Sequence, residues 1–262
     1  MTIGFNHLGR HGRLGNQMFQ YAGLRGIAAH RGFDFMIPDS DFKDEWTDHQ
    51  LFEAFKLKGL TNIGMCPGTY VGEAHFHYDA NLFNNMPDNH NVYAYLQSTK
   101  YFDHIEDEIR EDFEFKNDIR EPCEDMIATV SDPIALHVRR GDYIQNCDNH
   151  PPCPKEYYDA ALSKFDDKRN VIIFSDDPQW CGTEFPDDRF LISDGGDNLA
   201  DLCMMSLCSD FIIANSSFSW WGSWLSKNPN KRIIAPDKWF GIGYTRNHIT
   251  SDLYCSNWEV LK

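Results

Sequence analysis

The second half of the chain alternates short apolar runs with longer amphipathic segments. The apolar runs are typical of strands buried on both faces of a sheet, and the longer segments have helical spacing. The pattern predicts strands at 134–138, 171–174, 189–192, 211–214 and 232–235, and helices at 155–166 and 198–208. Strands that alternate with helices over short connections predict a parallel sheet covered on both faces.

The first half begins with the pattern of a similar unit. An expected strand at 3–8 precedes a loop of three glycines and two arginines, a helix at 16–31 and a strand at 33–38. Strand, glycine-rich turn, helix and strand form the first half of a nucleotide-binding unit, although the G-x-G-x-x-G spacing is missing. Glycines inside the helix weaken it unless a close neighbour requires small residues there.

The middle of the chain is less regular. Residues 40–78 predict an elaborated loop region with short strands, a suitable place for contacts with an acceptor. The pattern further predicts a strand at 92–96, a charged helix at 100–115 and an amphipathic segment at 121–130. The charge run at 106–114 indicates a solvated helix face. We place a domain boundary so that the domains span 1–125 and 126–262.

Composition narrows the classes of function. The 262 residues are 42% hydrophobic, enough for a sizeable core, and the formal net charge of −16 disfavours binding to nucleic acid or anionic lipid. The N-terminus lacks the pattern of a signal peptide, and no apolar stretch approaches a membrane span. We therefore expect a soluble, cytoplasmic protein. Eight scattered cysteines predict buried thiols rather than a disulfide framework.

Candidate chemistry follows the strand at 134–138, which delivers Arg139, Arg140, Gly141 and Asp142 in succession. Two guanidiniums at the end of a core strand are costly without partners, and the planar fork of Arg suits phosphate oxygens. One interpretation is a structural Arg–Asp network. The other is a diphosphate clamp, in which Arg139 binds the ligand and Arg140 points to the opposite side and serves the fold.

Two other strand ends in the same sheet are polar. Asp176 could accept two hydrogen bonds from guanine, or cap the helix expected at Pro178. Ser216 and Ser217 begin a helix, where they could bind phosphate or act as a simple cap. Ligands bind at the carboxyl ends of strands in such sheets, so three polar ends together suggest a nucleotide-diphosphate pocket. Asn16 and Gln17 lie at the start of the first expected helix. Their side-chain amides could cap that helix or hydrogen-bond a sugar.

The motifs HVRRGDY, FSDD, SSFSWWGSWL and GRLGNQMFQYA resemble those of the inverting α-1,2-fucosyltransferases, in the same order, from about Arg13 to Leu225. The His-x-Arg-Arg element is shared with α-1,6- and protein O-fucosyltransferases. The resemblance implies an α/β, GT-B-like fold with two Rossmann-like domains facing a central cleft. It further implies transfer of L-fucose from GDP-L-fucose to the 2-hydroxyl of a terminal galactose in an oligosaccharide acceptor. By the same resemblance the transfer inverts the anomeric configuration and needs no metal.

The resemblance also implies roles for single residues. Arg139 matches the arginine on the β-phosphate, and His137 belongs to the same donor-binding element. Asp176 matches the residue on guanine. The remaining matches are the phosphate-binding turn at Ser216 and Ser217 and the motif facing the sugar and acceptor at Asn16 and Gln17. We take Asn16 as a catalytic candidate and Gln17 as a donor-binding one.

The catalytic base is left open. In the α-1,6 relatives a carboxylate follows the arginine motif, and the corresponding place here falls near Cys147. Asp142 is the nearest carboxylate, and it enters the catalytic set although it could instead orient Arg139. Alternatives to the fucosyltransferase are a transferase for another GDP-sugar or another linkage, and a module that binds the nucleotide sugar without transfer.

Overall fold

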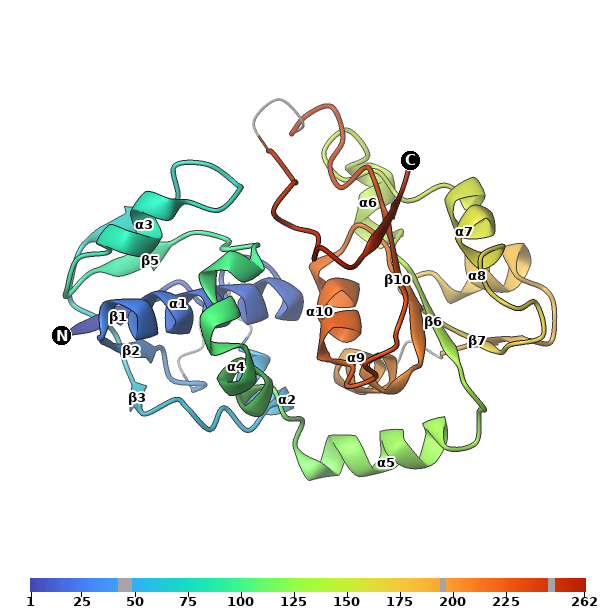
Figure 1. Ribbon diagram of the computed structural model, residues 1–262, viewed down its shortest axis with the longest axis horizontal. Helices are drawn as coiled ribbons and strands as arrows, with labels where there is room; N and C mark the ends of the chain where they lie inside the picture. Colours follow the sequence, from blue (N-terminus) through green and yellow to red (C-terminus); the bar gives the residue numbers. More distant parts are fainter. Residues whose placement is uncertain (42–48, 194–196, 245–247) are drawn as a thin grey trace. The chain divides into compact units, whose positions relative to one another are not determined.

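The computed structural model describes residues 1–41, 49–193, 197–244 and 248–262, so part of the expected loop region, 42–48, lies outside it. The chain forms two compact units (Figure 1). Unit 1 comprises Met1–Lys116 and Asn247–Cys255, and unit 2 comprises Asn117–Arg246 and Ser256–Lys262. The expected boundary after residue 125 falls within α5 (Asn117–Ile127), at the start of unit 2.

Unit 2 is built on a six-stranded parallel sheet with the order β11-β10-β9-β6-β7-β8. Its strands are β6 (Ile134–Val138), β7 (Val171–Ser175), β8 (Phe190–Ile192), β9 (Asp210–Ile212), β10 (Ile233–Pro236) and β11 (Glu259–Leu261). The chain runs outward from β6 to β8, then resumes at β9 on the other side of β6. The strand order therefore reverses between β6 and β9, the position where doubly wound sheets bind ligands.

Helices cover both faces of this sheet, as the sequence predicts. One face carries α7 (Lys155–Leu162) and α8 (Pro178–Glu184), and the other carries α9 (Asn198–Leu207) and α10 (Ser217–Leu225) (Figure 1). Leu136 of β6 and Ile173 of β7 are fully buried on the α7 side. The indoles of Trp220 and Trp221 in α10 are fully buried, as expected for core residues. The helix α5 packs against α9.

Unit 1 contains a five-stranded parallel sheet with the order β3-β2-β1-β5-β4. Its strands are β1 (Thr2–Gly4), β2 (Asp34–Ile37), β3 (Asn62–Ile63), β4 (Tyr70–Gly72) and β5 (Asn91–Tyr93). The long helix α1 (Leu14–Arg31) packs on β1 and β2. The short helices are α2 (Leu51–Ala54), α3 (Ala80–Asn85) and α4 (Glu106–Asp112). Here the strand order reverses between β1 and β5.

The glycines of α1 do have close neighbours. A Cβ at Gly23 would lie 2.6 Å from Cδ1 of Leu96, and one at Gly26 would collide with the carbonyl oxygen of Tyr101. The second clash is with backbone, which cannot move aside as a flexible side chain can. Close packing therefore offsets the low helix propensity of glycine at these positions.

The single charged helix expected at 100–115 is wrong. The chain forms two 3₁₀ turns, η1 (Thr99–Tyr101) and η2 (Asp103–Ile105), before α4. Tyr101 and Phe102 are fully buried, so the chain turns there to place both rings in the core. The face at 106–114 is also not uniformly solvated. Asp112 is fully buried, pairs with Arg25 and accepts a hydrogen bond of 2.7 Å from the Tyr21 hydroxyl.

Other differences are smaller. The strand expected at 3–8 ends at Gly4, and β11 extends the second sheet beyond the strand expected to be last. The helix α6 (Gly141–Gln145) begins directly after the arginines, where no helix was expected.

All eight cysteines are free thiols, but Cys147 is exposed and Cys255 half-buried, so the expectation of buried thiols is wrong for these two. Among the described helices, none is long and apolar enough to cross a bilayer.

Candidate functional site

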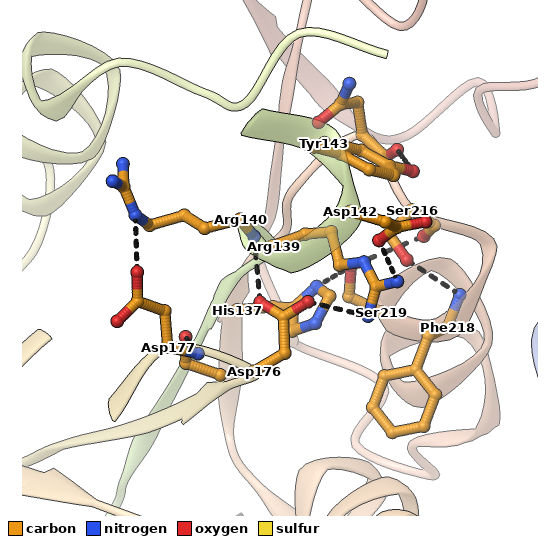
Figure 2. Close-up of polar contacts among 12 residues, drawn as sticks. His137, Arg139, Arg140, Asp142, Tyr143, Asp176, Asp177, Ser216, Phe218 and Ser219 are labelled. Carbon is orange, nitrogen blue, oxygen red and sulfur yellow. Dashed lines mark hydrogen bonds and ion pairs between the residues drawn. The ribbon is translucent and has the colours of Figure 1, made fainter. Parts of the chain in front are cut away.

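The strand β6 delivers two arginines at the point where the sheet order reverses. All five residues of β6 are buried, and Val138 at its end is paired with Ser175 of β7. The side chains of Arg139 and Arg140 then extend in opposite directions (Figure 2). This divergence agrees with the alternation expected at a strand end.

Arg139 is held by two carboxylates. One of its Nη atoms lies 2.8 Å from Oδ2 of Asp176, and the other pairs with Asp142 (Figure 2). The guanidinium carbon also lies 5.4 Å from the ring centre of Tyr143. The side chain is 17% exposed. A guanidinium has five N–H groups, so these pairs orient Arg139 and leave donors for an anion.

Arg140 joins the end of β6 to the start of α8. Its Nε lies 3.0 Å from Oδ2 of Asp177, and its guanidinium carbon lies 4.3 Å from the ring centre of Trp180. Asp177 caps α8, because its Oδ1 accepts a hydrogen bond of 3.1 Å from the Trp180 N–H. These contacts give Arg140 a structural role.

Asp176 organises the turn between β6 and α6. Its Oδ1 accepts a hydrogen bond of 2.8 Å from the backbone N–H of Arg140, while Oδ2 pairs with Arg139. Because Asp177 is the cap of α8, the alternative interpretation of Asp176 as that cap is wrong. Each carboxylate oxygen can accept more than one hydrogen bond, so Asp176 retains acceptor capacity.

His137 is buried inside β6 on the side of α10. Its Nδ1 lies 2.8 Å from Oγ of Ser219, in the first turn of that helix (Figure 2). Burial, with a smaller contribution from the charge of Arg139, lowers the pKa of His137 to about 3. The imidazole is therefore neutral near pH 7, and it connects β6 to the start of α10.

The start of α10 is fixed from several sides. Ser216 is the N-cap, and its Oγ accepts a hydrogen bond of 3.3 Å from the Phe218 N–H. Asn215 is buried, and its amide donates to the carbonyls of Pro151 and Trp239 at 2.9 and 3.0 Å. Ser217 is the first residue of the helix. The capping interpretation of Ser216 is confirmed, and the end that it caps carries the partial positive charge of a helix N-terminus.

Asn16 and Gln17 lie in the first turn of α1, in unit 1, whereas the other six candidates lie in unit 2. Oδ1 of Asn16 accepts a hydrogen bond of 2.9 Å from the amide of Gln97. Gln17 is fully buried, and its Oε1 accepts a hydrogen bond of 3.1 Å from the backbone of Gln50. The N-cap of α1 is Arg13, so neither amide is the capping residue.

Sequence reasoning missed several partners of the candidate residues. Trp180 was not singled out, although it follows Asp177 by one helical turn. Ser219 was quoted within a motif but given no role, and it is the contact of His137. Gln97 carried no signal in the sequence, because the sequence of a loop does not distinguish a buried, hydrogen-bonded glutamine from a solvent-exposed one.

The chain is similar to known glycosyltransferases over most of its length. Residues 73–261 match glycosyl transferase family 11. The Escherichia coli O-antigen biosynthesis glycosyltransferase WbnK is 30% identical, over 70% of this chain and 66% of its own length. The Escherichia coli alpha-1,2-colitosyltransferase is 29% identical, over 87% of this chain and 90% of its own. The Mus musculus galactoside 2-alpha-L-fucosyltransferase Sec1 is 24% identical, over 82% of this chain and 62% of its own.

A solved structure has the same fold. NodZ, an alpha-1,6-fucosyltransferase co-crystallised with GDP, superimposes with a TM-score of 0.60 and 16% identity, covering 90% of this chain and 94% of that one. The α/β, GT-B-like fold class is thereby confirmed. The family match covers well over half of the chain. The protein therefore belongs to glycosyl transferase family 11, the α-1,2-fucosyltransferase family whose motifs it shares.

Proposed function

We propose that the protein transfers L-fucose from GDP-L-fucose to the 2-hydroxyl of a terminal β-galactoside, with inversion and without a metal. The observation that supports this most is Arg139, held by two carboxylates at the reversal of the strand order in unit 2. A transferase that uses a sugar diphosphate must stabilise a leaving group that gains negative charge. A fixed guanidinium is suited to that task.

In this proposal Arg139 binds the β-phosphate. Because Asp142 and Asp176 already orient it, little reorganisation is needed when the glycosidic bond breaks. The start of α10 at Ser216 and Ser217 adds backbone donors and partial positive charge. A single preorganised donor typically contributes about 2.7–4 kcal/mol to the stability of a transition state.

Guanine would be bound by Asp176. A carboxylate can accept from N1–H and the N2 amino group together, and neither uracil nor adenine presents two such donors side by side. The side chain of Asp176 is 25% exposed and lies next to Arg139, and its oxygens retain acceptor capacity. The alternative is Asp177, although its carboxylate is already engaged by Arg140 and the α8 cap.

The acceptor hydroxyl would attack the anomeric carbon from the face opposite GDP, which gives inversion. In an oxocarbenium-like transition state the hydroxyl needs only weak assistance. Asn16, whose Oδ1 accepts from Gln97, is assigned to the acceptor, whereas Gln17 is fully buried and is assigned to support of the turn rather than to the donor. Asp142 pairs with Arg139, so we assign it to positioning and leave the base unassigned.

A second donor is favoured by one comparison, the similarity to an alpha-1,2-colitosyltransferase over 87% of the chain. Colitose is L-fucose without its 3-hydroxyl. GDP-colitose would therefore use the same diphosphate and guanine contacts, and only the sugar pocket would discriminate. The two donors, GDP-L-fucose and GDP-colitose, must therefore be compared directly.

The test incubates the purified protein with lactose and either GDP-L-fucose or GDP-colitose, with parallel reactions lacking lactose. We expect a fucosyl-lactose whose linkage is α-1,2 by NMR, and a higher kcat/KM for GDP-L-fucose. A higher kcat/KM for GDP-colitose would overturn the donor assignment. Binding of GDP without transfer from either donor would instead identify a non-catalytic module.

A further inference from the structure

Tyr143 contacts both parts of the proposed diphosphate site in unit 2. It lies in α6, four residues after Arg139, and its ring centre lies 5.4 Å from the guanidinium carbon of that arginine (Figure 2). Its hydroxyl donates a hydrogen bond of 3.0 Å to the carbonyl oxygen of Asn215, the residue before the N-cap Ser216. One side chain therefore joins the arginine to the start of α10.

The side chain of Tyr143 is held in one position and one protonation state. Burial raises the pKa of Tyr143 well above its ordinary value, although the charge of Arg139 acts in the opposite direction. The hydroxyl therefore stays protonated near pH 7 and remains a donor. The ring stacks on that of His150, with centres 5.1 Å apart and an angle of 24° between the planes, and His150 in turn contacts the rings of Phe240 and Tyr244.

The acceptor end of this link is also fixed. Asn215 is buried, and its side-chain amide donates to two backbone carbonyls. Its Oδ1 accepts a hydrogen bond of 3.5 Å from Sγ of Cys153. Because Ser216 follows directly as the N-cap, the carbonyl that Tyr143 holds lies just before the N-terminal N–H groups of α10. A shift of this carbonyl would therefore move the start of the helix.

A diphosphate is the ligand for which such a link matters. Its two phosphates lie at a fixed separation, so a guanidinium and a helix N-terminus can bind one phosphate each only if their own spacing is fixed. A monophosphate needs only one of the two groups.

We propose that Tyr143 is a positioning residue that keeps Arg139 and the start of α10 at the spacing of a diphosphate, and thereby makes the site prefer GDP to GMP. This inference rests on the proposed function, since it concerns the diphosphate of the donor in that reaction. The cation–π contact holds the arginine end of the link, and the hydroxyl bond holds the helix end.

The test compares Tyr143→Phe, which keeps the ring and removes the hydroxyl, with a matched control. The hydroxyl of Tyr157 donates to the carbonyl of Ile213 at 2.6 Å, two residues before Asn215. Tyr157→Phe therefore removes a comparable buried bond to the segment that leads into α10, while the link to Arg139 is kept.

Calorimetry with GDP and GMP measures the effect without turnover. We expect Tyr143→Phe to weaken GDP binding roughly 3- to 10-fold, the scale for the net loss of one hydrogen bond, and to leave the GMP affinity unchanged. Tyr157→Phe should retain the wild-type preference for GDP over GMP. In the transfer assay Tyr143→Phe should lower kcat with GDP-L-fucose and leave the KM for lactose unchanged.

A merely structural role for Tyr143 would give a different pattern. It would lower the melting temperature and weaken GDP and GMP binding in the same proportion, and that result would overturn the inference. An unchanged GDP affinity in Tyr143→Phe, or a wild type that binds GMP as tightly as GDP, would also overturn it. If Tyr143→Phe loses the GDP preference but the wild type transfers no sugar, the proposed function fails and the positioning role of Tyr143 stands.

Discussion

Gly141 lies directly against the carboxylate of Asp176. A Cβ at position 141 would come 2.6 Å from Oδ2 of Asp176, closer than real Cβ atoms approach. That oxygen cannot easily move, because it pairs with Arg139 while the other oxygen accepts from the Arg140 N–H. The glycine of the Arg-Arg-Gly-Asp sequence is therefore required by the ion pair beside it.

The first prediction follows from this contact. Gly141→Ala should displace Asp176 and misalign Arg139, which should weaken GDP binding about tenfold, close to the loss of one hydrogen bond to a charged group. Calorimetry with GDP measures the effect. The control is Gly182→Ala in α8, where a Cβ would meet only Cδ1 of Ile192 at 3.7 Å. Equal GDP affinities for wild type and Gly141→Ala would mean that GDP binding does not need the ion pair between Arg139 and Asp176.

Asp176 can be tested for guanine recognition separately from its hold on Arg139. Asp176→Ala should weaken GDP binding by about 1.5–3 kcal/mol. Inosine diphosphate lacks the N2 amino group, so the variant should also lose part of the preference for GDP over inosine diphosphate. If a folded Asp176→Ala keeps that preference, the guanine contact lies elsewhere. Asp177 would then be the first residue to examine, although removing its cap should also cost about 0.5–2 kcal/mol of stability.

Buried strands and their polar ends were the most predictable features. The strand at 134–138 was predicted with its observed ends, because a mostly apolar run between Pro133 and Arg139 leaves few alternatives. The divergence of Arg139 and Arg140 followed from strand alternation alone. The partners of the two arginines could not be predicted in this way. Asp176 and Trp180 lie in segments that come close to the arginines only because β6 and β7 pair in parallel.

Unit 1 was less predictable because tertiary contacts override local pattern there. The charges between Lys100 and Phe115 favour one helix, but burial of Tyr101 and Phe102 and the pairing of Asp112 with Arg25 break it into short turns. The strand predicted at 92–96 is present as β5 (Asn91–Tyr93), but the bounds of β4 were not predictable, because a three-residue strand shows no clear alternation.

A third prediction concerns acid stability. The pKa of His137 is lowered from its ordinary value of 6.5 to about 3. Between pH 3 and pH 6.5 the unfolded chain therefore binds a proton at His137 that the folded protein does not bind. The free energy of unfolding should therefore fall as the pH drops below about 6.5, with a slope of up to ~1.4 kcal/mol per pH unit from this group. His137→Asn, which does not titrate, should show a shallower slope in denaturant titrations between pH 7 and 4. Parallel slopes would show that another group is responsible.

A fourth prediction is that transfer does not require a metal. Asp176 and Asp177 are adjacent carboxylates that could hold Mg²⁺, but each pairs with an arginine. Activity should therefore persist after dialysis against excess EDTA. If activity is lost and then restored by Mg²⁺ or Mn²⁺, the carboxylates bind metal during the reaction, and the role of Asp176 must be reassigned.

The central claim is that Arg139 binds the diphosphate while Arg140 serves the fold. Arg140 is engaged by Asp177 and Trp180, so Arg140→Ala should lower the melting temperature and leave most of the kcat. Arg139→Lys keeps the charge but loses the planar fork, so it should reduce kcat while the protein remains folded.

The most direct measurement is the kcat of Arg139→Ala, with its melting temperature taken in parallel. We expect kcat to fall about 100-fold or more, the scale for removing one oxyanion-type donor, with little change in melting temperature. A folded Arg139→Ala that turns over at the wild-type rate would contradict the diphosphate clamp.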